Sequence, residues 1–252
     1  MRDFSLICPS NDGEAETIVK VAMELGIDVR DSRQPWGATL DKEPQENLRD
    51  LRKKIVVVEM PSPEKEEELR RAGHEVIIID HHNYVGMELD RSNPLSSLEQ
   101  FASLVGRELS RWEIGVAIND RAYIYGLLEA GYEMTEILAI RMADLEAQGA
   151  TRDDFVLCSE ALEKAETKNG ITIVRVATNK VTYINDLCVL GNPGKVQDIL
   201  ICSPNEINFS GSPEKAKALS ALGGWFGGGE VSKFWGSNFP VNEEVFRILG
   251  ID

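Results

Sequence analysis

The chain has 252 residues, a formal net charge of -15 at pH 7, and 42% hydrophobic and 27% charged residues. These values are typical of a globular protein, and no apolar run approaches the roughly 20 residues that a membrane span needs. The acidic balance disfavours a surface that binds long nucleic acid through many phosphate contacts. Four scattered cysteines without paired spacing indicate neither a zinc ribbon nor a disulfide framework, so we expect a cytoplasmic protein.

The first half of the chain alternates apolar, strand-like runs with amphipathic helical patterns, which is typical of βαβ units and a parallel sheet. Residues 4–8 form the first predicted strand. The helix that follows should begin after Asp12, which is placed to cap it. Residues 55–58 and 76–79 are continuous β-branched runs, so we expect these two strands to lie deep in the sheet.

Helix boundaries are marked by capping residues in the next part of the chain. Pro63 stands at the first helical position after Ser62, and Gly73 follows the last turn. Ser96 and Glu99 have the spacing of a capping box. Further helical patterns continue to residue 165, and a polar turn near residue 166 predicts a domain boundary.

The remaining residues mix short strands and helices. We expect a strand from residue 171, a helix over 182–190, strands over 198–202 and 206–209, and a helix over 213–222. The predicted fold class is therefore α/β, with a mainly parallel first domain over 1–165 and a smaller mixed domain over 166–252.

Polar side chains follow three of the predicted strands. Residues 8–12 come after the first strand, Glu59 closes the second, and Asp80, His81 and His82 close the third. Ligands of parallel sheets bind beyond the carboxyl ends of the strands, where these groups should meet. Carboxylates and imidazoles together form a ligand set for a divalent metal, whereas a single strand-end aspartate or histidine is commonly structural.

These motifs resemble the DHH phosphoesterase superfamily, which includes RecJ-like exonucleases, oligoribonucleases and cyclic dinucleotide phosphodiesterases. The resemblance rests on four segments in the family order, and it spans nearly the whole chain. The segments are ICPSNDG at 7–13, IIIDHHNY at 77–84, AINDRA at 117–122 and GGWFGGGE at 223–230. It implies a DHH-type phosphoesterase domain followed by a DHH-associated substrate-binding domain.

The resemblance also implies roles for individual residues. One metal position would be formed by Asp12, Glu59, His81 and Asp120. His82 would face the scissile phosphate, and Asp80 would orient the histidines.

The other metal position departs from the family pattern, because Cys8 and Ser10 stand where that pattern has a histidine and an aspartate. Serine holds manganese or magnesium poorly, whereas a cysteine thiolate favours zinc or iron. We therefore expect a divalent metal, with manganese preferred and zinc or iron as alternatives because of Cys8. The alternatives of one ion, a different pair or none remain open. Asn11, Glu14 or Glu16 could compensate, although their places at a helix start are sufficient reason for these residue types.

Substrate-binding residues are implied by the glycine-rich segment. Backbone N–H groups of Gly227, Gly228 and Gly229 could cradle an anion, with Lys233 and Arg121 as charge partners. Glu230 stands where the family has a histidine. A tight turn explains the glycines equally well.

Aromatic residues flank the same glycines. Trp225, Phe226, Phe234 and Trp235 could stack on a base or could form the core of a small domain.

The function that the sequence predicts is a metal-dependent hydrolase, a phosphoesterase acting on a small nucleotide or short oligonucleotide. The alternative is a DHH-fold protein that has lost catalysis and binds nucleotides or serves as a scaffold. The expected partner is a small phosphorylated ligand, without long nucleic acid or membrane, and a homodimer is left open.

Overall fold

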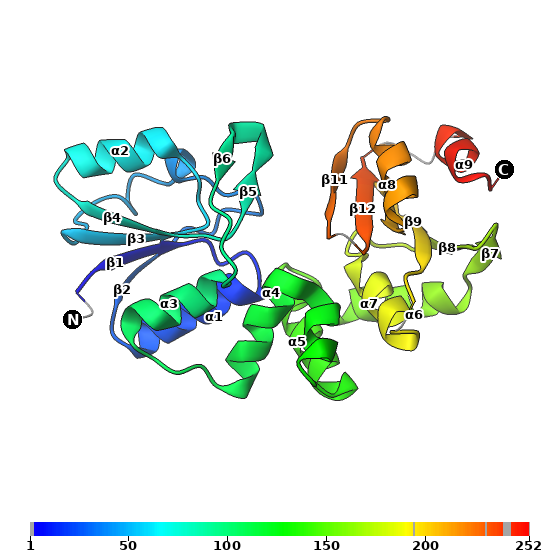
Figure 1. The fold of residues 1–252 in the computed structure, drawn as a ribbon, viewed down its shortest axis with the longest axis horizontal. Coiled ribbons are helices and arrows are strands. Elements are labelled where there is room, and N and C mark those ends of the chain that lie inside the picture. The colour runs from blue at the N-terminus through cyan, green and yellow to red at the C-terminus, as the bar shows by residue number, and fades with distance from the viewer. Residues whose placement is uncertain (1–2, 194, 230, 239–242, 252) are drawn as a thin grey trace. The chain divides into compact units, whose positions relative to one another are not determined.

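A computed structural model describes residues 3–193, 195–229, 231–238 and 243–251 (Figure 1). The fold is α/β, as predicted, and the chain divides into two compact units, Met1–Gly149 and Ala150–Asp252. A search of the described residues for a helix with the length and hydropathy of a membrane span finds none. Each unit has its own sheet.

The first unit is built on a four-stranded sheet in the order β2-β1-β3-β4, and all its neighbours pair in parallel. The strands are β1 (Ser5–Cys8), β2 (Asp28–Asp31), β3 (Lys54–Val58) and β4 (Glu75–Ile79). The predicted parallel sheet is therefore confirmed. Because β1, β3 and β4 are adjacent and parallel, their carboxyl ends lie at one edge.

Helices cover both faces of this sheet. Helices α1 (Gly13–Glu24) and α3 (Ser97–Val105) lie on one face, and α2 (Pro63–Arg71) lies on the other (Figure 1). The predicted start of α1 is confirmed, because Asp12 Oδ1 accepts a hydrogen bond of 2.8 Å from the Ala15 amide. The capping box of α3 is also present, since Ser96 and Glu99 bond reciprocally.

The prediction that residues 76–79 form a deep strand is wrong. β4 is an edge strand of the sheet, and only Ile79 of this run is fully buried. Val76 and Ile78 pack against a core cluster on one side and remain partly exposed. A β-branched run indicates a strand with apolar faces, but it does not distinguish a central strand from one whose outer edge lacks a neighbour.

Between β4 and α3 lie a short hairpin and a 3-10 turn, and a further 3-10 turn precedes β3. The hairpin is β5 (Asn83–Tyr84) with β6 (Leu89–Asp90), and the turns are η2 (Val85–Met87) and η1 (Leu40–Lys42). Helices α4 (Arg111–Glu129) and α5 (Met134–Ala147) complete the unit. α4 is kinked at Tyr123, whose φ of 55° is not helical.

The second unit contains a mixed six-stranded sheet in the order β11-β12-β10-β9-β8-β7. Its strands are β7 (Glu166–Lys168), β8 (Ile171–Arg175), β9 (Asp198–Cys202), β10 (Ile207–Gly211), β11 (Trp225–Gly228) and β12 (Lys233–Ser237). One core cluster joins the sheet to α8 (Pro213–Ser220) and α9 (Glu243–Leu249), and another joins it to α6 (Arg152–Glu163) and α7 (Thr182–Gly191).

The two compact units divide at Gly149, earlier than the predicted boundary at residue 165. α6 belongs to the second unit because Cys158 and Ala161 pack with Val174 and Ile199 of the second sheet. The polar turn at residue 166 instead leads into β7, an exposed strand of that sheet. The polar residues do form a turn, but a turn inside a compact unit has the same sequence signature as a linker between two units.

The glycine-rich segment forms part of a β-hairpin. Gly227 lies opposite Phe234 across the β11–β12 pair, and a side chain at 227 would contact that ring at 2.7 Å. Gly228 has a φ of 100°, which favours glycine. Of the flanking aromatics, Trp235 is only 2% exposed and belongs to the core, whereas Phe226 and Phe234 are exposed.

Trp235 should contribute to stability rather than to ligand binding. Its indole Nε1 donates a 2.7 Å hydrogen bond to the Gly223 carbonyl, and its ring packs in the core. We expect Trp235→Ala to lower the free energy of unfolding by about 3 to 5 kcal/mol. Trp235→Phe should cost about 1 to 3 kcal/mol, because it keeps most of the packing but leaves the carbonyl unpaired. Urea denaturation measures both, and equal costs would contradict this account.

Candidate metal centre

The predicted strand-end residues do meet at one edge of the parallel sheet. Cys8 ends β1, Glu59 directly follows β3, and Asp80 directly follows β4. The Glu59 amide donates a 3.0 Å hydrogen bond to the Ile79 carbonyl, which fixes the ends of β3 and β4 to each other. The backbone of Glu59 has a φ of 51°, in the left-handed region, and this turn directs the chain out of the sheet.

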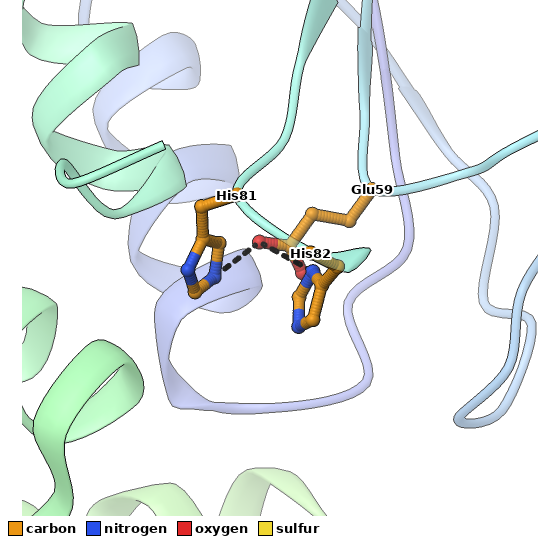
Figure 2. A group of neighbouring side chains, drawn as sticks. All are labelled: Glu59, His81 and His82. Atoms are coloured by element: carbon orange, nitrogen blue, oxygen red, sulfur yellow. Dashed lines mark ion pairs between the residues drawn. The ribbon is translucent and has the colours of Figure 1, made fainter. Parts of the chain in front are cut away.

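Four side chains bring ligand atoms together at this edge. Glu14, Glu59, His81 and Asp120 each offer one such atom, and these atoms lie within 4.8 Å of one another. His81 Nε2 is 3.2 Å from Glu59 Oε1 and 2.8 Å from Asp120 Oδ2. Figure 2 shows Glu59 between the rings of His81 and His82. We call the set of Glu14, Glu59, His81 and Asp120 the acid–histidine cluster.

Each member of the acid–histidine cluster has a buried polar atom without a hydrogen-bond partner in the part of the chain that the structure describes. The atoms are Glu14 Oε2, Glu59 Oε1, His81 Nε2 and Asp120 Oδ2. The two contacts of His81 are close enough for ion pairs, but neither has hydrogen-bond geometry. Buried polar atoms are nearly always paired, so an unpaired atom on each of these four converging residues indicates a site for a cation.

The charges of the cluster perturb one another strongly. Burial lowers the pKa of His81, but contacts with the Asp120 and Glu59 carboxylates outweigh burial and raise it to about 11. Burial also opposes the charge of Glu59, yet the adjacent His81 holds the pKa of Glu59 below its ordinary value. For Glu14, burial and repulsion from Asp120 and Glu59 raise the pKa well above its ordinary value. A bound cation would relieve this repulsion.

Asp12 lies close to the cluster but serves another purpose. Its Oδ1 caps α1 through the Ala15 amide, and Asp12 is not among the four residues whose ligand atoms converge. Burial, together with the nearby charges of Glu59 and Asp120, outweighs the amide hydrogen bond and raises the pKa of Asp12 to about 7. Of the predicted ligands, the structure thus brings together Glu59, His81 and Asp120.

Glu14 is the cluster member that the sequence did not single out as a ligand. Its position in the first turn of α1 already explained an acid, because carboxylates are favourable at helix N-termini. The signal that could have identified it is burial, since Glu14 is only 3% exposed on a helix whose other first-turn acid, Glu16, is not buried.

Beside the cluster, His82 is held by Asp80. Asp80 Oδ1 accepts hydrogen bonds from the His82 amide at 3.0 Å and from its Nδ1 at 3.1 Å. The Tyr84 hydroxyl donates to the same carboxylate, and Arg91 Nη1 lies 3.6 Å from Asp80 Oδ2. The His82 side chain is 46% exposed, and its Nε2 forms no hydrogen bond within the described residues. His82 therefore presents one free ring nitrogen at the edge.

The pKa values of this pair follow from their contact. The hydrogen bond to Asp80 raises the pKa of His82, and it outweighs the effect of burial. Burial raises the pKa of Asp80, but hydrogen bonds from His82 and Tyr84 hold it below its ordinary value. The pair favours a charged imidazolium next to a carboxylate.

Cys8 and Ser10 do not point to a second metal position. Cys8 is fully buried, its thiol contacts the Pro9 and Ala15 carbonyls at 3.9 and 3.8 Å, and burial raises its pKa well above the ordinary value. Ser10 lines a groove of about 580 Å³ along α1, together with Asn119 and Asp144. Neither residue belongs to a convergent group of metal-ligating side chains among the described residues.

The predicted substrate-binding residues have structural contacts of their own. Arg121 pairs with Glu99 at 3.1 Å, and the Lys233 ammonium donates a 3.2 Å hydrogen bond to the Gly228 carbonyl. Gly229 follows β11 in the hairpin, and Glu230 lies outside the described residues. Substrate binding by these residues stays a prediction.

Comparisons with known proteins show similarity in structure but not in sequence. Neither a protein-family model nor a curated protein matches the sequence. The DHH domain of a member of the s1p family of ribosomal proteins matches with a TM-score of 0.56 at 15% identity, over 99% of this chain and 86% of that chain. This match shows the fold.

Two further similar structures have lower scores. An exopolyphosphatase-related protein from Bacteroides fragilis is 13% identical, over 98% of this chain and 91% of that chain, with a TM-score of 0.49. RecJ from Thermus thermophilus in complex with Mn²⁺ is 14% identical, over 98% of this chain but only 50% of that chain, with a TM-score of 0.47.

The left-handed backbone conformation of Glu59 should affect the stability of variants at this position. In metal-free protein, Glu59→Gly should be more stable than Glu59→Ala by about 1 kcal/mol, because only glycine adopts this conformation without steric cost. Both variants lack the carboxylate, so each is the control for the other. Chemical denaturation measures the difference, and a more stable alanine variant would show that the positive φ is not strained.

The raised pKa of His81 predicts how the stability of metal-free protein depends on pH. A folded-state pKa of about 11, above the unfolded value of about 6.5, stabilises the fold fully below pH 6.5. This contribution is lost as pH rises toward 11. We expect the free energy of unfolding of wild type to fall between pH 7 and 10, by at most about 1.4 kcal/mol per pH unit from this group.

The control for this prediction is His81→Gln, which cannot be protonated. Its free energy of unfolding, measured with chelator present, should fall less steeply over the same pH range. Equal slopes for wild type and variant would mean that the histidine does not hold its proton between the two carboxylates.

Proposed function

Because this chain has the fold of DHH-domain proteins, we propose that it is a metal-dependent phosphoesterase that hydrolyses a phosphoester or phosphoanhydride bond in a small nucleotide or short oligonucleotide. The observation that carries the proposal is the acid–histidine cluster, with its four unpaired buried atoms at the carboxyl edge of the parallel sheet. This edge is where ligands of open α/β sheets bind.

The donor set fits a divalent transition metal. Glu59, His81 and Asp120 would hold the ion, with one more acid from the start of α1. Carboxylate oxygens with one imidazole suit manganese or iron, and the buried thiol of Cys8 gives no reason to prefer zinc. A bound ion would act as a Lewis acid on the phosphate and lower the pKa of attacking water.

His82 is the residue proposed to act on the substrate directly. Its exposed ring is charged readily, because Asp80 holds Nδ1 and raises the pKa of the ring. The free Nε2 can donate a hydrogen bond or a proton to a phosphate oxygen. Tyr84 and Arg91 support the same step indirectly, since they contact the Asp80 carboxylate that orients His82. The pair thus fixes the direction of the ring and leaves Nε2 toward the edge.

The substrate class is proposed from charge and size. A net charge of -15 opposes long nucleic acid, which is bound through many phosphate contacts. Glycine amides of the β11–β12 hairpin and Lys233 are the proposed contacts of the second unit with phosphate. The exposed rings of Phe226 and Phe234 lie on the same hairpin and could stack on a base.

A second candidate is a protein of the same fold that binds a nucleotide without hydrolysing it. The observations that favour it are the neutral Cys8 and Ser10, which leave no second convergent metal group separate from the first in the described part of the chain. The acid–histidine cluster and the exposed His82 favour catalysis instead. Binding of metal and nucleotide without any turnover would support the second candidate.

Hydrolysis of bis-p-nitrophenyl phosphate and of a short dinucleotide with Mn²⁺ tests the proposed function. We expect His82→Gln to lower kcat/KM by about 10² to 10⁴-fold while Mn²⁺ binding is kept, because the general acid is lost but the ion is not. Asp120→Ala should abolish both activity and the rise in melting temperature on adding Mn²⁺.

The matched control is His74→Gln, which removes the third histidine of the chain. His74 is partly buried and contacts the Arg52 carbonyl at 2.9 Å, before β4 begins and away from the carboxyl edge. Its variant should hydrolyse both substrates like wild type. If the wild-type protein neither binds Mn²⁺ nor hydrolyses either substrate, the proposed function is contradicted.

A further inference from the structure

We propose that Glu14 and not Asp12 is the fourth ligand of the centre, and that the centre holds a single ion. This inference rests on the proposed function, since it concerns the same metal. It departs from the ligand set implied by the sequence motif, in which Asp12 would coordinate. The exchange moves the ligating carboxylate two residues along the chain, from the cap of α1 into its first turn.

The first observation is the way Glu14 is held. One carboxylate oxygen, Oε1, accepts a 3.0 Å hydrogen bond from the Leu98 amide in the first turn of α3. The other oxygen, Oε2, is buried without a hydrogen-bond partner among the described residues, and Glu14 belongs to the acid–histidine cluster. One oxygen thus orients the carboxylate while the other remains available, which is the arrangement of a metal-ligating carboxylate.

The second observation is that Asp12 caps α1 and lies outside the convergent groups of ligand atoms. Its Oδ1 accepts the 2.8 Å hydrogen bond of the Ala15 amide, and its backbone is extended as a helix cap requires. Among the described residues, one of the two convergent groups of ligand atoms includes Glu14, and neither includes Asp12. Asp12 is therefore assigned to the start of the helix, and Glu14 follows in the first turn.

The third observation concerns the number of ions. A second convergent group contains Glu59, His81 and His82, but it shares Glu59 and His81 with the first. The two groups overlap, and His82 Nδ1 is bonded to Asp80. The thiol of Cys8 faces backbone carbonyls, and Ser10 lines the groove beside α1. The described residues therefore provide donors for one ion at a time.

The donor set also predicts a preference among ions. Three carboxylates and one imidazole surround the position, without a thiolate. Hard oxygen donors with one nitrogen suit Mn²⁺, whereas Ca²⁺ requires six to eight oxygen ligands. We expect the chain to bind Mn²⁺ more tightly than Ca²⁺.

The test is isothermal titration of the full chain, stripped of metal with chelator, against Mn²⁺. Wild type should bind one Mn²⁺ per chain. Glu14→Gln should weaken binding at least about tenfold, because even the loss of an outer partner of a ligand costs that much. The matched variant Asp12→Asn should bind within about threefold of wild type, because asparagine caps a helix as well as aspartate.

Melting temperatures distinguish loss of a ligand from loss of the fold. Without metal, Glu14→Gln should melt at or above wild type, because one buried carboxylate is removed from a repelling cluster. With saturating Mn²⁺ the order should reverse, since wild type gains more from the ion.

The outcomes separate this inference from the proposed function. Retained Mn²⁺ affinity in Glu14→Gln with loss in Asp12→Asn, or two ions per wild-type chain, would overturn the inference and leave a metal-dependent phosphoesterase intact. Absence of Mn²⁺ binding to wild type would overturn both. A Glu14→Gln variant with lower melting temperature than wild type when metal is absent would assign Glu14 to folding and overturn the inference alone.

Discussion

The centre depends on the parallel registration of three adjacent strands. Because β1, β3 and β4 run in the same direction and pair as neighbours, the residues that follow them lie close together at one edge of the sheet. The hydrogen bond between the Glu59 amide and the Ile79 carbonyl extends this registration one residue beyond the strands. The charged side chains are thus brought together by backbone hydrogen bonds between neighbouring strands.

Assembling these charges conflicts with the solvation that each would have in water. Hydrophobic burial of strands such as Ile55 to Val58 supplies the free energy that holds the edge together. The positive φ of Glu59 and the kink at Tyr123, three residues after Asp120, lie at or close in sequence to members of the acid–histidine cluster. Unfavourable backbone conformations of this kind persist where the surrounding structure determines them, and they are frequent at functional sites.

Much of the fold could be predicted because local signals were strong and consistent. The cap at Asp12, the capping box at Ser96 and the apolar strands each have a short-range physical cause. The edge position of β4 and the membership of α6 in the second unit depend on which element packs against which, and local patterns do not contain that information. Strand β2, with its mixed sequence DVRD, has no apolar pattern that would reveal it.

The residues of the site likewise divide into those that local signals predict and one that depends on packing. Glu59, His81 and Asp120 could be predicted to converge, because the strand-end rule and the motif agreed. The convergence of Glu14 could not be predicted, because an acid at that position has two possible reasons. It can stabilise the helix N-terminus or it can belong to the cluster, and the first reason alone was sufficient. The depth at which a side chain is buried decides between them, and that depth is a property of α1 packed against the start of α3.

The bond from the Leu98 amide to Glu14 joins residues 84 positions apart, and it links the ion position to the first turn of another helix. The chemical shift of an N–H group that donates to a carboxylate depends on the electron density of that carboxylate. The Leu98 amide is therefore a natural spectroscopic probe. Its nitrogen and proton resonances would report the state of the centre without any label on the ion. Its solvent exchange would likewise record how firmly the two helices are held together at their amino ends.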